Sequence, residues 1–491
     1  MKKIAVIGSG FAGLTSAIEL ASLGYQVTVF EKNSTLGGRA RKFETNGFTF
    51  DMGPSWYWMP DVFDKFFARH GKKVEDYYNL LKLDPGFSVV YGKDNTIDVP
   101  ASLEELVALF ENIEKGSGSR LKKFLKKAAK KYNIGMDSLV YKPSHSIFEF
   151  FNLKVLIGVL YLDVFSNFRS YVKKYFSDSR LTRLMEFPVL FLGATPQNTP
   201  ALYSLMNYSA FSQGTYYPMG GFHEIILGLS KLAKEKGVII NCDSNVDRLD
   251  IVNGNVENVV VNGDKLFFDG VIASADYHHV EQKLLDKPFR NYSTEYWDKR
   301  EMSPSSLLFY VGVDKRLNNL QHHNLFFDAD FDQHAKEIYD NPKWPKNPLF
   351  YLSCPSITDP SLAPKGNENL MFLIPLAPGL EDTNEMREKY FDIVLKRLKD
   401  LTGNDIEKNI IFKKSYCVND FEKDYNSFKG NAYGLANTLR QTAVLKPRMR
   451  NKKIKNLYYT GQLTVPGPGV PPSIISGQIA AIEIDKYLNK L

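Results

Sequence analysis

One stretch at the beginning of the chain limits the possible folds more than any other feature. Residues 4–7 form an apolar run, Gly-Ser-Gly-Phe-Ala-Gly follows at 8–13, and apolar residues continue at helical spacing to residue 21. A second apolar run, residues 26–30, ends in an acid at Glu31. Strand, glycine loop, helix, strand and acid in this order are the fingerprint of a dinucleotide site. The chain is therefore predicted to begin with a nucleotide-binding βαβ unit.

Each glycine of this loop has a separate physical role. Gly8 permits the tight turn after the strand, Gly10 lets a pyrophosphate approach the backbone, and Gly13 lets the helix pack closely on the strand. Phe11 and Ala12 begin the helix, whose free N–H groups and dipole favour an anion. We therefore expect the phosphates of a dinucleotide to lie against this loop.

The residues after the second strand distinguish FAD from NAD, because both cofactors use this fingerprint. Glu31 can accept hydrogen bonds from both ribose hydroxyls, and Lys32 follows it directly. Gly38 and Arg39 belong to a Gly-Gly-Arg segment that resembles the motif of glutathione-reductase-type FAD proteins. Such a guanidinium can lie near the phosphates or the flavin, although a surface ion pair is the alternative for Arg39. We predict that the cofactor is FAD.

Two later segments are expected to contribute to the same site. A tight turn with Gly53, Pro54 and Ser55 is predicted to lie near the isoalloxazine ring. Alternating runs on both sides of an Asn-Gly turn at 253–254 predict a β-hairpin, and Val246 on its first strand would meet the adenine through its backbone. Residues 267–276 are expected to form another buried strand that ends in a loop of small residues.

The C-terminal block supplies the other side of the predicted flavin site. A strand at 457–460 leads into a loop rich in glycine and proline, and a helix is expected from about Ser473. The N–H groups at its start could stabilise negative charge on a reduced flavin. The cofactor residues predicted in this loop are Gly461, Gln462, Gly469 and Val470. No second glycine fingerprint follows a strand, so the electrons are expected to come from the substrate itself.

These motifs resemble the bacterial-type phytoene desaturases, the carotenoid desaturases of the amine-oxidase-like flavoproteins. The family's C-terminal signature matches Asn456, Tyr458, Gly461, Thr464, Pro466, Gly467, Gly469, Val470 and Gly477. The resemblance also covers residues 1–55 and the Tyr-Pro-Met-Gly-Gly segment at 217–221. The chain departs from the pattern at Gln462-Leu463, at Val465 and at Pro468.

The resemblance implies an α/β fold with a glutathione-reductase-type Rossmann FAD-binding domain that is discontinuous in sequence. We expect this domain to comprise residues 1–75, 222–285 and 440–491. A mixed-sheet substrate domain would comprise residues 76–99, 191–221 and 286–439. Residues 100–190 would form a helical lid that docks on a membrane.

The implied activity is FAD-dependent desaturation of phytoene toward lycopene, by hydride transfer from an allylic carbon to flavin N5. Quinone or oxygen would reoxidise the flavin. Within the family, the alternatives are a C30 dehydrosqualene desaturase, a hydroxycarotenoid desaturase and a carotenoid oxidase. Outside it, they are amine or protoporphyrinogen oxidation and a non-enzymatic lipid-binding escort like the Rab GDP-dissociation inhibitors. No cysteine lies beyond Cys417 to tether a flavin, and both ends of the flavin site are intact.

Two uncharged stretches are candidates for the binding of a long apolar polyene. Residues 187–222 and 302–313 contain no Asp, Glu, Lys or Arg, although such residues make up 24% of the chain. A polyene has no polar handle, so its binding energy must come from buried area, at about 25 cal/mol per Å². Plain buried core is the alternative for any single residue, whereas the set is interpreted as a tunnel that ends at the flavin.

A substrate of this kind resides in a bilayer, so the enzyme is predicted to dock on the cytoplasmic side of a membrane. Residues 121–132 carry six lysines at amphipathic helical spacing, and residues 147–165 are rich in apolar side chains. An ordinary solvated helix above a core helix is the alternative. The N-terminal apolar run is too short for a signal peptide, and no run reaches the roughly 20 residues of a membrane span.

Composition excludes other classes of partner, and the sequence does not assign a catalytic side chain. A net charge of +7 is too small to indicate nucleic acid, and three scattered cysteines support neither disulfides nor a zinc site. The allylic cation is delocalised, so the reaction is expected to need little more from the protein than positioning and exclusion of water, with a general base as the alternative. Glu186, the last carboxylate before the uncharged stretch, and His223 are candidates for a general base.

Overall fold

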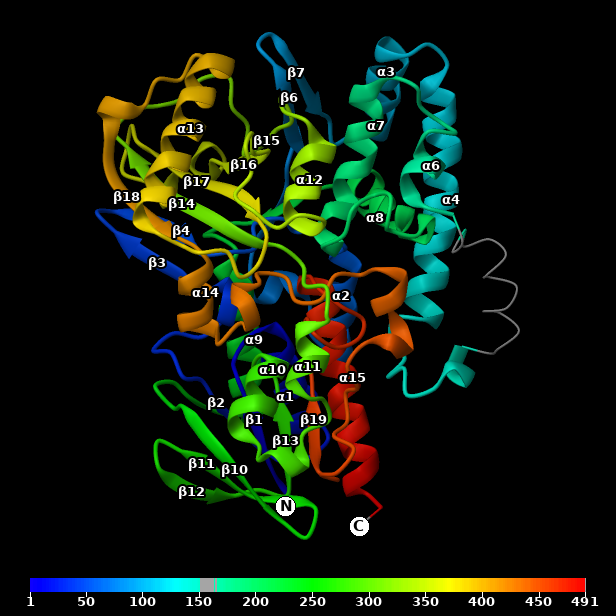
Figure 1. The fold of residues 1–491 in the computed structure, drawn as a ribbon, viewed down its shortest axis with the longest axis vertical. Coiled ribbons are helices and arrows are strands. Elements are labelled where there is room, and N and C mark those ends of the chain that lie inside the picture. Colours follow the sequence, from blue (N-terminus) through cyan, green and yellow to red (C-terminus); the bar gives the residue numbers. More distant parts are fainter. Residues whose placement is uncertain (151–162, 164–165, 491) are drawn as a thin grey trace.

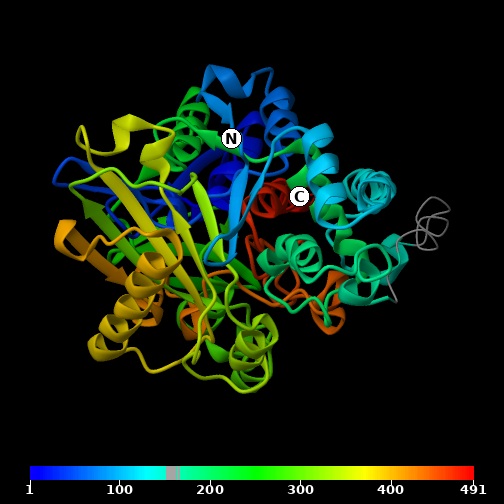
Figure 2. The same cartoon turned by 90° about the horizontal axis from the view of Figure 1, so that it is seen from above.

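The computed structural model describes residues 1–150, 163 and 166–490 (Figure 1). A parallel sheet with its helices occupies the lower half of Figure 1, and a larger sheet and a group of helices lie above it. Figure 2 shows that this larger sheet and the helical group lie on opposite sides of the molecule, with α15 near the centre.

The lower sheet confirms the predicted βαβ unit and extends it. Its five strands are parallel and run in the order β19 (Leu457–Tyr459), β13 (Gly270–Ala273), β1 (Lys3–Ile7), β2 (Gln26–Phe30) and β9 (Ile239–Asn241). Against its strands pack α1 (Phe11–Ser22) and α15 (Val470–Leu488), while α9 (His223–Glu235) packs on α1 and α2 (Pro60–Arg69) packs on α15. Ile4 to Val6 are fully buried, as expected for a central strand that is covered on both faces.

The predicted hairpin forms the first two strands of a separate antiparallel sheet. This sheet consists of β10 (Val246–Val252), β11 (Asn255–Val261) and β12 (Asp264–Phe267). The strand expected over residues 267–276 is therefore divided: Phe267 ends an exposed edge strand, and only Gly270–Ala273 enters the parallel sheet. The expected C-terminal helix begins at Val470, three residues before Ser473.

The upper sheet has seven strands and is mixed, because β15 and β6 pair in parallel while the other pairs are antiparallel. In order, they are β18 (Ile410–Tyr416), β14 (Ser305–Val313), β17 (Glu368–Leu376), β16 (Phe350–Ser353), β15 (His323–Phe326), β6 (Phe87–Gly92) and β7 (Asn95–Val99). All nine residues of β14 are buried, so this strand forms the centre of a core. Two-stranded sheets pair β3 (Lys42–Thr45) with β4 (Phe48–Asp51) and β5 (Leu80–Lys82) with β8 (Tyr216–Pro218).

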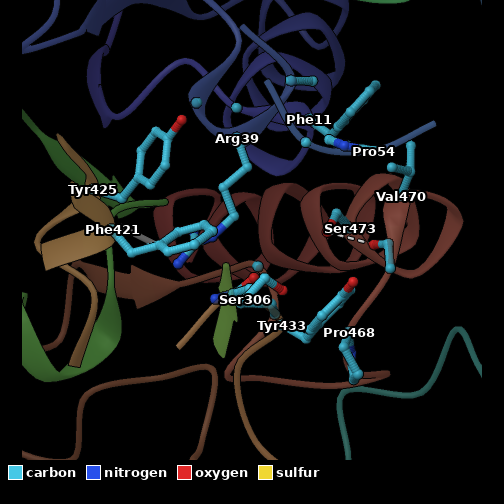
Figure 3. Close-up of a pocket in the computed structure, with 18 of the residues that line it drawn as sticks. Phe11, Arg39, Pro54, Ser306, Phe421, Tyr425, Tyr433, Pro468, Val470 and Ser473 are labelled. Atoms are coloured by element: carbon cyan, nitrogen blue, oxygen red, sulfur yellow. Dashed lines mark hydrogen bonds between the residues drawn. The ribbon is translucent and has the colours of Figure 1, made fainter. Parts of the chain in front are cut away.

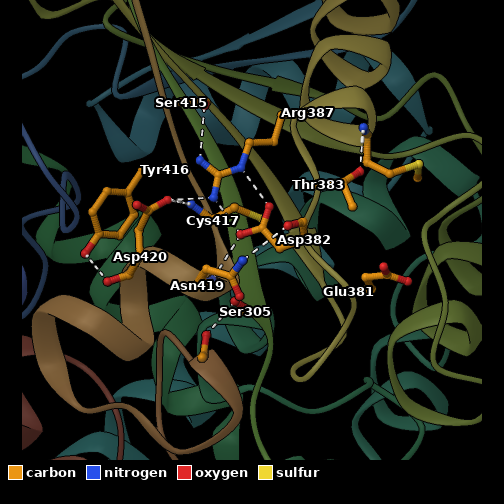
Figure 4. Close-up of polar contacts among 12 residues, drawn as sticks. Ser305, Glu381, Asp382, Thr383, Arg387, Ser415, Tyr416, Cys417, Asn419 and Asp420 are labelled. Atoms are coloured by element: carbon orange, nitrogen blue, oxygen red, sulfur yellow. Dashed lines mark hydrogen bonds and ion pairs between the residues drawn. The ribbon is translucent and has the colours of Figure 1, made fainter.

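Further helices connect these strands, the first two beside the lower sheet and the other three beside the upper sheet (Figure 1). They are α10 (Tyr277–His279), α11 (Thr294–Asp298), α12 (Phe331–Tyr339), α13 (Asn384–Thr402) and α14 (Val418–Tyr425). Arg387 on α13 pairs with Asp382 at 2.6 Å and with Asp420 on α14 at 2.7 Å, and it also donates to Ser415 on β18 (Figure 4). This network ties α13, α14 and the edge strand together and so fixes α14, which reaches the site described below.

The helical group corrects one part of the membrane interpretation. It comprises α3 (Leu103–Ile113), α4 (Ser117–Ser138), α6 (Phe168–Val172), α7 (Ser179–Glu186) and α8 (Leu205–Tyr208). The apolar side of α4 is buried within the protein, where Phe124 packs against Tyr171 and Phe176. It therefore cannot be the face that enters a bilayer.

The lysines of α4 also differ from the expectation of six on one solvated side. Lys122, Lys123, Lys126, Lys127 and Lys130 are exposed. Lys131 is 1% exposed, because its ammonium pairs with Asp163 at 2.9 Å and donates to Ala201 O and Ser204 Oγ. Most of the apolar segment expected at 147–165 lies outside the described residues. None of the helices described here is both long and apolar enough to cross a membrane.

Candidate active site

A cavity of about 480 Å³ lies where the carboxyl ends of the parallel strands meet the upper sheet. Gly8 after β1, Glu31 after β2, Ser274 after β13 and Thr460 after β19 all line it. In open α/β sheets, this edge is where ligands bind. All of the predicted cofactor residues line the cavity except Gly13.

The geometry of the glycine loop fits a bound pyrophosphate. Gly8 has a φ of +98°, which favours glycine, and its N–H donates to Phe30 O at 2.8 Å. A Cβ on Gly10 would meet no atom within 4 Å, so the backbone is open to a ligand there. A Cβ on Gly13 would lie 2.0 Å from Gly8 O, so this glycine serves the packing of helix on strand and not the cavity wall.

Glu31 projects into the cavity as expected and is held by its neighbours. Its Oε2 accepts hydrogen bonds from Ser9 N at 3.0 Å and Ser9 Oγ at 2.6 Å. Its Oε1 accepts from Asn33 N and Nδ2. These four hydrogen bonds fix the carboxylate in position and occupy its roughly four lone-pair sites, so a ribose hydroxyl would bind Glu31 by replacing or sharing one of them. Lys32 is different: its ammonium donates to Lys423 O at 2.7 Å.

Arg39 reaches across the cavity to segments that the sequence did not connect with it (Figure 3). Its Nη2 donates to Ser427 Oγ at 2.9 Å and to Asn431 O at 3.2 Å, while its buried Nε has no hydrogen-bond partner among the described residues. Burial lowers the pKa of Arg39, and the charge of Asp276 opposes this shift. A buried guanidinium with a free N–H is suited to a phosphate or flavin oxygen.

Asp276 is a cavity residue to which the sequence assigned no role. Burial raises its pKa to about 6, although Arg39 and the N–H groups of His279 and Phe428 favour its charged form. Its sequence signal is its position directly after β13, where the carboxyl end of a parallel strand points at the site. Tyr425 and Tyr433 also line the cavity, and no local motif marks them.

The C-terminal loop and α15 close the cofactor side of the cavity. Gly461, Gln462, Gly469 and Val470 all line it, and Gly469 caps the helix with a φ of +110°. Because Pro471 and Pro472 follow, only Val470 offers a free N–H among the first three helical residues. The start of this helix therefore offers fewer N–H groups to an anion than an ordinary helix N-terminus does.

The other half of the cavity is apolar and is made by side chains from many elements. Its lining includes Trp56, Phe187, Leu325, Phe327, Phe331 and Phe350. Of the uncharged stretch 187–222, the cavity lining contains Phe187, Leu190, Thr195 and Met206. Among described residues, much of that stretch is core, as with Phe211 and Tyr217. Strands β15 and β16 and helix α12 supply lining that the sequence did not predict.

Neither candidate for a general base reaches the cavity. Glu186 is 1% exposed, and its two oxygens accept from Arg169 Nε and Nη2, each at 2.7 Å. His223 Nδ1 lies 2.7 Å from Ala40 O, and burial lowers the pKa of its imidazole. Both side chains are thus engaged in structural contacts.

Comparison with known proteins agrees with this geometry. The family model for flavin-containing amine oxidoreductases matches residues 11–485. The chain is 40% identical over 479 residues to a carotenoid 3,4-desaturase of Haloarcula japonica, covering 97% of each chain. It is 33% identical over 489 residues to a 4,4′-diapophytoene desaturase (4,4′-diaponeurosporene-forming) of Staphylococcus haemolyticus, again covering 97% of each.

A solved structure extends the agreement to the fold. An oxidoreductase from Methanosarcina mazei superposes with a TM-score of 0.64 at 17% identity, covering 97% of this chain and 98% of the other. The glycine cradle, the buried Arg39 and the open backbone at Gly10 fit FAD. The chain therefore belongs to the flavin-containing amine oxidoreductases and, within them, to the carotenoid desaturases, as an FAD-dependent oxidoreductase that acts on carotenoids.

Proposed function

We propose that this enzyme introduces a double bond between carbons 3 and 4, near one end of an acyclic carotenoid. The observation that carries the proposal is the 40% identity, along nearly the whole chain, to a carotenoid 3,4-desaturase, against 33% to a diapophytoene desaturase. Phytoene, which the sequence motifs suggested as substrate, stays a prediction.

The residues around the glycine loop would hold the cofactor. Gly8 and Gly10 would receive the pyrophosphate, Glu31 the ribose, and Arg39 the phosphates or flavin, while Val246 would meet the adenine. Bound FAD supplies a two-electron acceptor that can take a hydride from the substrate. Quinone or oxygen is the proposed final acceptor of those electrons.

The apolar half of the cavity would bind and orient the polyene. At about 25 cal/mol per Å² of apolar area, some 300 Å² of buried substrate surface contributes about 7–8 kcal/mol without any hydrogen bond. Close walls such as Trp56 and Phe331 would also exclude water from the reacting carbons. The side chains therefore place an allylic CH₂ and keep the site dry.

Product analysis tests this proposal. The gene is expressed in three cell lines that accumulate phytoene, lycopene or diapophytoene, and the pigments are separated by chromatography. We expect conversion of lycopene to a more conjugated, longer-wavelength product. Conversion of phytoene alone would contradict the proposed 3,4-desaturation and support phytoene desaturation. Conversion of diapophytoene alone would indicate an enzyme that acts on C30 substrates.

We also propose that the enzyme docks on an anionic membrane surface through the five exposed lysines of α4. Each lysine near such a surface contributes about 1 kcal/mol. Flotation with phosphatidylserine-containing vesicles should therefore fall sharply when Lys122, Lys123, Lys126, Lys127 and Lys130 are replaced by glutamine. Equal flotation of both proteins would contradict docking through this face.

A further inference from the structure

Ser55 lies in the wall between the large cavity and a second, much smaller chamber. Ser55 lines both, and the chamber is also lined by Asp51, Tyr217 and His322. Its volume is about 20 Å³, and an ordered water needs about 10–15 Å³ together with polar partners. The chamber is therefore suited to hold one water behind the wall of the active site.

A hydrogen-bond chain holds Ser55 in this position. The Tyr351 hydroxyl donates to Ser55 Oγ at 3.0 Å, and His323 Nδ1 lies 2.6 Å from the same Tyr351 oxygen. His323 is fully buried and stacks on Trp56 with ring centroids 4.2 Å apart. With Tyr351 donating to Ser55, the Nδ1–H of His323 donates to Tyr351. The hydrogen of Ser55 is then available to another acceptor.

Asp51, at the end of β4, places a carboxylate on the chamber wall. Its oxygens accept from Phe222 N at 2.6 Å and His223 N at 3.0 Å, which leaves lone pairs on both. Burial raises the pKa of Asp51 to about 6, while those N–H groups and Lys42 lower it and Glu224 raises it. At neutral pH, the carboxylate is therefore ionised, yet it binds a proton more readily than an exposed aspartate does.

Desaturation requires a proton acceptor near the substrate. Removing two hydrogens from a CH₂–CH₂ unit releases a hydride, for which bound FAD would be the acceptor, and a proton from the adjacent carbon. His334 lines the apolar half, but its Nε2 faces Pro375 O at 2.9 Å and its Nδ1 accepts from Leu349 N. Glu186 is held by Arg169. Neither side chain is available for the proton.

We propose that Ser55 takes this proton from the carotenoid while it passes its own to the chamber water, and that Asp51 is the final acceptor. The electrons of the broken C–H bond form the new C=C bond, and the Asp51 carboxylate becomes a carboxylic acid, so charge and atoms balance. Tyr351 and His323 are positioning residues that orient Ser55. The proposal rests on carotenoid desaturation, but not on which carotenoid is used.

The same chamber gives the proton a way out between turnovers. His322 lines the chamber, and its Nδ1 lies 2.9 Å from Thr358 Oγ1, whose residue is half-exposed. Burial lowers the pKa of His322 to about 3, so the imidazole is neutral and can both accept and donate. A proton can leave Asp51 by the water, His322 and Thr358 without crossing the apolar cavity.

Stopped-flow reduction of bound FAD, under anaerobic conditions and with a carotenoid that the wild type desaturates, tests the relay. Ser55→Ala should slow reduction about 10²-fold, the usual contribution of a proton-transfer group, while FAD content stays the same. Ser55→Thr keeps the hydroxyl and should restore most of the rate. Tyr351→Phe should fall between them, and the wild-type rate should decrease in D₂O.

Tyr390→Phe is the matched control for Tyr351→Phe. Tyr390 is a buried tyrosine of α13 that donates to Pro345 O and does not line either cavity. It should keep the wild-type rate. A Ser55→Ala enzyme that reduces FAD at the wild-type rate, or that merely loses FAD, would overturn the proposal. If the wild-type enzyme desaturated a bond other than the one between carbons 3 and 4, only the proposed function would change, and the proton relay would stand.

Asp51 can be tested without any substrate by infrared titration of the holoenzyme. The charged and titratable groups facing it are Lys42, Glu224, His223 and the phenols of Tyr217, Tyr310 and Tyr351. A carboxylic-acid C=O band should appear as the pH falls through about 6, be lost in Asp51→Asn, and shift in Ser55→Ala because the chamber water loses a partner. The reduction rate should decline over the same pH range. A band insensitive to both substitutions would contradict the proposal.

Discussion

The two ends of the cavity are built from different parts of the polypeptide. At the cofactor end, backbone dominates: Gly8 turns with a positive φ, Gly10 leaves open space where we propose that the phosphates bind, and Val470 offers a helix N–H. At the substrate end, side chains such as Phe331 from distant elements form the wall. Backbone sites need particular residues at fixed spacing, whereas an apolar wall needs only bulk. A backbone site can therefore be predicted from a sequence, whereas an apolar wall cannot.

Two glycine substitutions at the cofactor end should have different effects, one on the stability of the fold and the other on the affinity for FAD. Gly13→Ala places a Cβ 2.0 Å from Gly8 O, so it should destabilise the fold by about 3 kcal/mol or more. Gly10→Ala meets no protein atom and should leave stability unchanged. It should instead weaken FAD binding about 5- to 150-fold, the equivalent of 1–3 kcal/mol of crowding against the cofactor.

Thermal unfolding of the two apoproteins, together with FAD titration by fluorescence quenching, separates these effects. The expected pattern is a lowered Tm for Gly13→Ala alone, and weakened binding at an unchanged Tm for Gly10→Ala. If Gly10→Ala unfolded as readily as Gly13→Ala, Gly10 would be a packing residue, and the pyrophosphate cradle would have to lie elsewhere.

The same contrast explains how far the sequence could be interpreted. The positions of β1, α1 and β2 follow from local periodicity and glycine spacing, and the structure agrees. Tyr425 and Tyr433 could not be found in this way, because no local pattern links residues that folding alone brings to one cavity. His323 and Tyr351, 28 residues apart on paired strands, are a further example.

Amphipathic periodicity led to a wrong prediction for the apolar face of residues 121–132, because the pattern does not show what covers that face. The spacing of residues 121–132 correctly predicts a helix with an apolar face, but not whether that face meets lipid or protein. In the structure, the face is covered, and Lys131 is buried because Asp163 compensates its charge. A pattern thus fixes which side of a helix is buried, while the identity of the covering partner depends on the rest of the chain.

Filling the substrate end should impair turnover while the cofactor end stays intact. Ala335 of α12 lines the cavity, so Ala335→Phe would occupy space needed by the polyene. Losing about 50 Å² of apolar contact costs about 1.3 kcal/mol, so we expect roughly tenfold weaker carotenoid binding with normal FAD content. Lys336→Phe adds the same ring next to it on the exposed side of the helix and is the control.

Binding of a carotenoid product, followed by its visible absorbance, checks this prediction independently of turnover. Ala335→Phe should require about ten times more product for half saturation, and Lys336→Phe should match the wild type. Equal affinities for all three proteins would show that the polyene does not pass α12, and that the substrate lies in another part of the cavity.

The remaining prediction concerns charge, which is concentrated at the cofactor end. Burial raises the folded-state pKa of Asp276 to about 6, above the ordinary value of 3.8. Between these values, the folded apoprotein binds a proton that the unfolded chain does not. Stability should therefore rise as the pH falls from 7 to 4, by up to about 2–3 kcal/mol from this group. Asp276→Asn should lack this contribution.

Urea unfolding of the wild-type and Asp276→Asn apoproteins at several pH values measures the difference directly. Because Asp51 and other groups titrate equally in both proteins, only the gap between their unfolding free energies reports on Asp276. That gap should move in favour of the wild type on acidification. A gap independent of pH would mean that Arg39 fully compensates the Asp276 charge. The cofactor end would then hold a neutralised ion pair, and not an acid kept ionised at a cost in stability.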